Sequence, residues 1–154
     1  MKEQVINYIE NILEIPRDEY NGMSACPFAK KERESNNIYI DTISIKNNFI
    51  TCMNNFIKSK MKSAIFIQDI NIEEKTTKRY QKFLNKYLDL KHWKALCINP
   101  NDNLEVDGFN VRSLAPYFMV LINDKKDIYY AHKSMQNTKY YDKMDVKYKK
   151  YLGI

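Results

Sequence analysis

Two segments of the chain hold the side chains best suited to chemistry. The first, NGMSACPFAKKERE (residues 21–34), places Cys26 directly before a proline and a run of charged residues. If Pro27 begins a helical turn, Cys26 occupies the N-cap, where backbone N–H groups and the positive end of the helix dipole favour a thiolate. Free cysteine is also often buried, and no histidine lies nearby in the sequence to act as a base. Cys26 is therefore predicted to be either a catalytic nucleophile or a small apolar residue in a pocket wall.

The second segment, NPNDNLEVDGFNVRSLAP (residues 99–116), contains Arg112, one of only four arginines in a lysine-rich chain. A loop of about sixteen residues without an evident element of its own is unusual in a compact domain unless it is functional. The planar guanidinium suits bidentate recognition of a carboxylate or phosphate. The alternative is structural: Arg112 attaches the loop to a neighbouring carbonyl or to Asp107.

Four polar side chains are expected to complete a site with Arg112. Asp69 and Asn99 each follow a predicted strand, and ligands of open sheets gather at the carboxyl ends of parallel strands. Asn110 and Ser113 flank Arg112 in the loop. We therefore predict a pocket between the Cys26 turn and the Arg112 loop. We expect the protein to be a small cytosolic enzyme or ligand-binding protein that acts on an anionic small molecule in this pocket.

The same two segments resemble a bacterial protein family of unknown activity. That family has a Leu-Cys-Pro-Phe-Ala element after an N-terminal helix and an Asn-Arg-Ser-Pro-x-Pro element entering its last strand, similar to GMSACPFA at 22–29 and RSLAP at 112–116. Asn99 stands where the family has a histidine. The resemblance implies a shared fold and a shared neighbourhood for Cys26 and Arg112, and it supplies no reaction.

Hydrophobic periodicity predicts the elements that must position these side chains. Helical spacing predicts a helix over 2–14 and another that begins after Asn47 or Asn48 and buries Cys52. Strands and helices then alternate, which is typical of parallel βαβ units. We expect an α/β fold: a small, ferredoxin-sized single-domain sandwich of a mixed, mainly parallel sheet with helices packed on it. The strands are predicted at 38–45, 63–70, 93–100 (which buries Cys97) and 116–123, and a third helix, capped near Asn71, is predicted to carry Tyr80, Phe83, Leu84, Tyr87 and Leu88 on one face.

Composition limits the class of protein further. A chain of 154 residues that is 44% hydrophobic is expected to form one domain over residues 1–154. No apolar run approaches the ~20 residues of a membrane span, and residues 1–15 contain acids throughout, unlike a signal peptide. The three cysteines have no close pair, and His92 and His132 are far apart. We therefore expect a reducing, cytoplasmic location, no membrane partner and no metal site, while cofactor, reaction and oligomeric state stay open.

The C-terminal segment, residues 125–154, supports two other functions. The net charge is +6, and this segment interleaves lysines with tyrosines. One hypothesis is a nucleic-acid-binding module in which tyrosines stack on bases and lysines follow the phosphates. Another is a non-enzymatic adaptor or subunit whose tail is disordered until it docks. The structural alternative is a solvated lysine face with the tyrosines at 140, 141, 148 and 151 packed inward.

Overall fold

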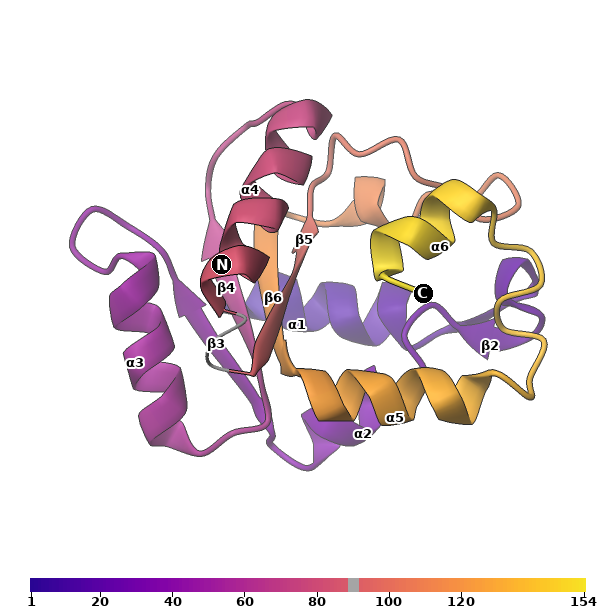
Figure 1. Cartoon of the computed structure of the whole chain (residues 1–154), viewed down its shortest axis with the longest axis horizontal. Helices are drawn as coiled ribbons and strands as arrows, with labels where there is room; N and C mark the ends of the chain where they lie inside the picture. The colour runs from indigo at the N-terminus through magenta and orange to yellow at the C-terminus, as the bar shows by residue number, and fades with distance from the viewer. Residues whose placement is uncertain (89–91) are drawn as a thin grey trace.

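The computed structural model describes residues 1–88 and 92–154, with a four-stranded sheet at the centre (Figure 1). The strand order is β3 (Ile38–Thr42), β4 (Ser63–Gln68), β6 (Phe118–Asp124) and β5 (Trp93–Ile98). β3 and β4 pair in parallel, whereas β6 is antiparallel to both of its neighbours. Strands β3, β4 and β5 therefore run in one direction, with β6 reversed between β4 and β5.

The α/β class and the mixed sheet are confirmed, but the parallel share is smaller than expected. Two of the three strand pairings are antiparallel because β6 follows β5 through the loop at 99–117 and not through a crossover helix. Two consecutive strands that pair with each other run antiparallel when the chain does not cross to the other end of the sheet between them.

Helices and short elements surround this sheet. The helices are α1 (Lys2–Tyr8), α2 (Ala29–Glu34), α3 (Phe49–Ser59), α4 (Glu74–Leu88), α5 (Lys125–Met135) and α6 (Val146–Leu152), and α1 continues as the π-helix η1 (Ile9–Leu13). Two 3₁₀ turns are η2 (Asp18–Tyr20) and η4 (Arg112–Leu114). The short strands β1 (Pro16–Arg17) and β2 (Met23–Ser24) form a small antiparallel pair.

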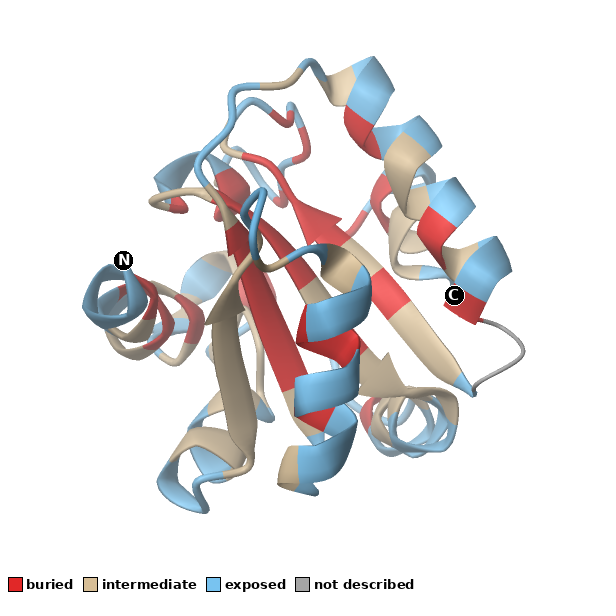
Figure 2. Ribbon diagram, turned by 90° about the vertical axis from the view of Figure 1, so that its left-hand side faces the viewer, coloured by how far each residue is buried: buried red, intermediate tan, exposed pale blue. Residues whose placement is uncertain are grey.

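Helices α3 and α4 cover one face of the sheet, where the largest core cluster lies (Figures 1 and 2). The predicted N-cap is confirmed: the Asn48 side chain accepts a hydrogen bond from the Thr51 N–H at 3.0 Å. Cys52 and Cys97 are both fully buried in this cluster, as predicted. Burial raises the pKa of Cys52 to about 11 and that of Cys97 to about 12, so both thiols are inert core groups at neutral pH.

The prediction of which α4 residues face the core is partly wrong. Leu84 and Leu88 are buried, but Phe83 is 66% exposed and Tyr87 is 40% exposed, while Thr77 is buried in their place. Thr77 contacts the start of the long loop through Asn99, which draws that side of the helix onto the sheet. Asn71 lies outside the helix, which begins at Glu74.

On the other face of the sheet, α1 and η1 pack on the β4–β6 half. Tyr8, Ile9 and Leu13 from these helices form one cluster with Ile67 and Met119 from the strands. On the β5 side of this face lie α5 and the segment that follows it (Figure 1).

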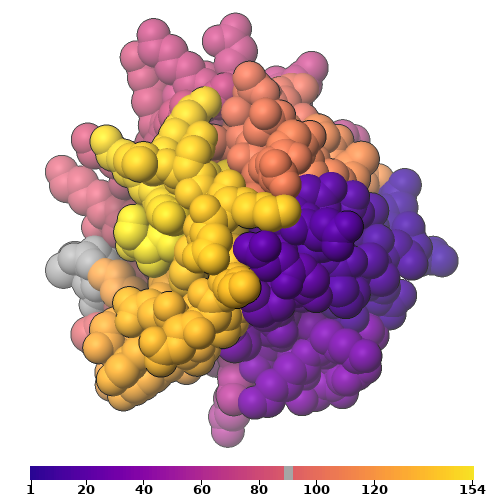
Figure 3. Space-filling view, turned by 90° about the vertical axis from the view of Figure 1, so that its right-hand side faces the viewer, coloured from indigo at the N-terminus to yellow at the C-terminus, as the bar shows by residue number. Residues whose placement is uncertain are grey.

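The C-terminal segment folds back onto the N-terminal part of the chain, and Figure 3 shows the two ends side by side on one surface. Tyr140 and Tyr148 are 8% and 6% exposed and pack with Tyr20, while Tyr141 and Tyr151 are partly buried against the same cluster. These four tyrosines therefore face inward, as in the structural alternative. This arrangement leaves these four rings little free surface for stacking on nucleic-acid bases.

Within the described residues, every helix is too short or too polar to cross a bilayer.

Candidate ligand-binding cavity

A cavity of about 530 Å³ lies between the β5–β6 side of the sheet, the Cys26 turn and α5. Both Cys26 and Arg112 line it, although they are distant in the sequence. The structure thus brings together the two side chains that the sequence predicted to share a site. The apolar part of the wall comes from Leu13, Leu96, Ile98, Leu121, Ile128, Ala131 and Met135.

The cavity reaches the surface of the sheet at two paired leucines. Leu96 on β5 and Leu121 on β6 are register partners, and both are only partly buried. Their strand neighbours Ala95 and Ile122 point to the opposite face and are fully buried. Leu96 belongs to the edge strand β5 and Leu121 to its neighbour β6, so the partly buried pair marks the β5–β6 edge of the sheet as the floor of the cavity.

Cys26 lies in a turn before α2, and its predicted N-cap position is wrong. The helix begins at Ala29, with Phe28 at the N-cap. The backbone N–H groups of Phe28 and Ala29 lower the pKa of the Cys26 thiol, in the direction predicted, although the Ala29 N–H donates its hydrogen bond to the Cys26 carbonyl at 3.1 Å. Burial nevertheless raises the pKa of the Cys26 thiol, and these N–H groups offset only part of the effect. The predicted thiolate is therefore not favoured, and Cys26 is a neutral, polarisable part of the cavity wall at physiological pH.

This protonation state is testable in a variant with Cys52→Ser and Cys97→Ser, which leaves one thiol. We expect iodoacetamide to alkylate Cys26 more slowly than the cysteine of a peptide spanning 22–29, because only the thiolate reacts. We also expect Cys26→Ser to change the free energy of unfolding by no more than about 1–2 kcal/mol. A thiol that titrates below the ordinary cysteine range would contradict this assignment.

Arg112 is buried, with 2% of its surface exposed, and it is held by partners within the chain. Its Nη1 donates to the Cys97 carbonyl at 2.9 Å and to Asp102 Oδ2 at 3.1 Å, and its Cζ lies 3.8 Å from the centroid of the Tyr151 ring. Burial raises the pKa of Asp102, and Arg112 offsets part of that rise. These contacts match the structural role proposed for Arg112, with Asp102 in place of Asp107, which pairs with Lys143 at 2.9 Å.

The buried ion pair is not fully satisfied. Arg112 Nε and Asp102 Oδ1 are both buried without a hydrogen-bond partner. Such groups are uncommon in folded proteins because each one costs about 1–3 kcal/mol of lost hydration. Arg112 also lines the cavity, so this buried ion pair lies at its wall.

The other four predicted site residues do not line this cavity. Asn99 is buried and bonds to the Ile72 carbonyl at 2.8 Å and to Thr77 Oγ1 at 2.6 Å, so it ties the end of β5 to α4. Asn110 caps η4: its Oδ1 accepts from the N–H groups of Arg112 and Ser113 at 3.1 and 3.2 Å. The Ser113 hydroxyl donates back to the Asn110 carbonyl at 2.8 Å. Asp69 is exposed at the end of β4. Asn110 and Ser113 therefore shape the turn that presents Arg112.

Tyrosine hydroxyls form hydrogen bonds between the segments that surround the cavity. Tyr8 Oη donates to the Val111 carbonyl at 2.9 Å, and Tyr140 Oη donates to the Ala25 carbonyl at 2.5 Å. Tyr151 Oη donates to the Cys97 carbonyl, the oxygen that Arg112 also contacts. The N-terminal helix, the Cys26 turn, the long loop and the C-terminal segment are thus joined around one space.

Two residues of the cavity wall were missed by sequence reasoning. Lys94 is a lysine in the otherwise apolar strand segment WKALCI, which was the only local signal for it. His132 had no partner that the sequence could identify, but its Nδ1 lies 2.6 Å from Tyr141 Oη. Burial lowers the pKa of His132, and Lys94 lowers it further, so the imidazole is neutral at physiological pH.

Among the side chains in the described ranges, no group of three or more His, Cys, Asp or Glu is placed to hold a metal ion. Comparison of the chain with protein-family models, with curated proteins and with solved structures finds no match. The family resemblance of the Cys26 and Arg112 segments therefore stays a hypothesis.

Proposed function

We propose that this protein is a small-molecule-binding protein whose ligand occupies the cavity between the Cys26 turn and the Arg112 loop. The observation that carries the proposal is the pair Leu96 and Leu121, two adjacent apolar side chains on the β5–β6 edge of the sheet that are only partly buried and line a cavity. A volume of about 530 Å³ lies within the range of about 300–1,000 Å³ that small-molecule sites occupy.

The lining favours a ligand with an apolar body. The sheet contributes Leu96, Ile98 and Leu121, and α5 contributes Ile128 and Ala131. Filling this space would remove apolar surface from water at roughly 25 cal/mol per Å². Polar contacts would come from the Cys26 thiol, the Arg112 guanidinium and other polar side chains of the lining, such as Lys94, Asp127 and His132.

Binding is better supported than catalysis. Burial raises the pKa of Cys26, which keeps the thiol protonated and weakens it as a nucleophile. Arg112 is already paired with Asp102, so its charge is largely compensated before a ligand arrives. A catalytic role, in which Cys26 attacks a substrate held by Arg112, therefore has less support than a binding role, in which both side chains only line the cavity.

Filling the cavity from the sheet tests the proposal. We expect Leu121→Trp to weaken the binding of the neutral fluorescent dye N-phenylnaphthylamine by at least about tenfold, or about 1.4 kcal/mol. Its free energy of unfolding should stay near that of the wild type, because the added ring enters empty space. Ile57→Trp, on the exposed side of α3, is the matched control and should bind the dye as the wild type does. Wild-type protein that binds no dye in its folded state, or Leu121→Trp protein that binds it fully, would refute the proposal.

A further inference from the structure

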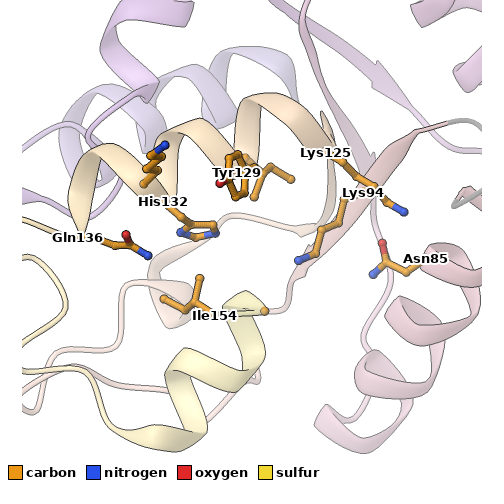
Figure 4. Close-up of a pocket in the computed structure, with 10 residues that line it drawn as sticks. Asn85, Lys94, Lys125, Tyr129, His132, Gln136 and Ile154 are labelled. Atoms are coloured by element: carbon orange, nitrogen blue, oxygen red, sulfur yellow. The ribbon is translucent and has the colours of Figure 1, made fainter.

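A second hollow lies on the outer side of α5, next to the C-terminal end of α6 (Figure 4). Its volume is about 670 Å³, and it is more open than the inner cavity. In the close-up, Lys94 and Gln136 extend from opposite sides toward the space beside His132, and Ile154 lies below them. We call this hollow the Lys94 groove; Asn85, Lys94, Lys125, His132, Lys133 and Gln136 are its polar side chains.

The groove is positively charged. Three lysines line it, whereas no aspartate or glutamate side chain is found among its described lining residues. His132 adds hydrogen-bonding capacity without charge, because burial and Lys94 lower its pKa. Concave surfaces lined by one sign of charge concentrate ions of the opposite sign. The amide group of Gln136 supplies further N–H donors of the kind that bind oxyanions, whereas the Asn85 amide is bonded to the Ala95 carbonyl and N–H at 2.9 and 2.8 Å.

The groove and the inner cavity are adjacent. Lys94, Ile128 and His132 line both of them. Lys94 lies on the same side of β5 as Leu96 and Ile98, since side chains of a strand alternate between faces. One strand therefore leads from the apolar wall of the cavity directly to the charged groove.

We propose that the ligand is an amphipathic anion, with its apolar body in the inner cavity and a carboxylate, sulfonate or phosphate group in the Lys94 groove. This inference rests on the proposed function and adds the sign and place of the ligand's charge. It also places the anion at Lys94, whose Nζ makes a long hydrogen bond of 3.5 Å to the Leu152 carbonyl, and not at Arg112, which is paired with Asp102.

Two dyes with the same apolar body separate the two parts of the site. Anilinonaphthalene sulfonate carries an anionic group, and N-phenylnaphthylamine lacks it. We expect wild-type protein to bind the sulfonate several-fold more tightly, with an advantage that shrinks as salt rises. Lys94→Gln should weaken the sulfonate about three- to tenfold more than it weakens the neutral dye. Lys94→Arg should retain most of the advantage, and Lys58→Gln on the exposed face of α3 is the charge-matched control.

Competition identifies the anionic group. Decanoate and decyl phosphate should displace N-phenylnaphthylamine more effectively than decanol, and the stronger of the two names the carboxylate or the phosphate as the better fit. Equal binding of both dyes by wild type and by Lys94→Gln protein would overturn this inference while leaving the proposed function intact. Failure of both dyes to respond to Leu121→Trp would overturn the proposed function and this inference together.

Discussion

Replacing Arg112 by leucine is expected to lower the free energy of unfolding by about 3–5 kcal/mol. The change removes the guanidinium that is paired with Asp102, and leaves the carboxylate of Asp102, which is 3% exposed, buried without that partner. It also releases the Cys97 carbonyl from Arg112 Nη1 and withdraws the cation from the Tyr151 ring. Chemical denaturation monitored by the fluorescence of Trp93 measures the loss.

Two further variants separate the ion pair from the loss of packing. Arg112→Leu combined with Asp102→Leu should recover most of the stability, because a buried pair replaced by apolar groups is often neutral or stabilising. Arg79→Leu, which removes an exposed arginine from α4, should change stability by about 0.5 kcal/mol or less. Equal effects of the Arg112 and Arg79 changes would show that the pair has no structural role.

Raising the pH above 10 is expected to unfold the protein cooperatively. Burial raises the pKa values of Tyr8, Tyr20, Tyr140 and Tyr151 above that of a free tyrosine. Groups with a raised folded pKa stabilise the fold fully below their unfolded pKa, here about 10, and this contribution is lost as the pH rises toward the folded value. Each such tyrosine costs about 1.4 kcal/mol per pH unit in that window, so four cost about 5 kcal/mol per unit.

A stability-against-pH curve with tyrosinate absorbance recorded in parallel measures this effect. Tyrosine ionisation should coincide with unfolding and not precede it. Tyr20→Phe should reduce the slope above pH 10 by about one proton, or about 1.4 kcal/mol per pH unit. Tyr129→Phe, at a tyrosine that is 61% exposed on α5, should leave the slope unchanged. Tyrosines that ionise freely at pH 10 in a folded protein would show that the C-terminal segment does not seal this side of the domain.

Local patterns determined much of the fold. The spacing around Cys52 located α3 and its buried face, and Asn48 was found as its cap because an N-cap depends on bonds within one turn. The apolar run around Cys97 was read correctly as a core strand. The expectation that Cys26 and Arg112 face one space also agrees with the structure, which places both in the wall of a single cavity.

Contacts between distant segments decided the rest. β6 is antiparallel because of the path of the 99–117 loop, which periodicity does not encode. The protonation of Cys26 depends on burial by the surrounding elements, such as η1, whose Leu13 carbonyl accepts the Cys26 N–H at 3.0 Å. Its local sequence favours a thiolate, and the surrounding protein reverses that preference because desolvation outweighs the effect of the nearby backbone N–H groups.

The candidate site divides in the same way. Residue types in the chain determined that a thiol, a guanidinium and many phenols would be present. Only the tertiary structure paired Arg112 with Asp102 and turned the tyrosines at 140, 141, 148 and 151 inward. It also placed Leu96 and Leu121 in the wall of a cavity that Lys94 lines too. The physical reason is that charge compensation and cavities are properties of packing among remote segments, whereas capping and amphipathic periodicity act within a few residues.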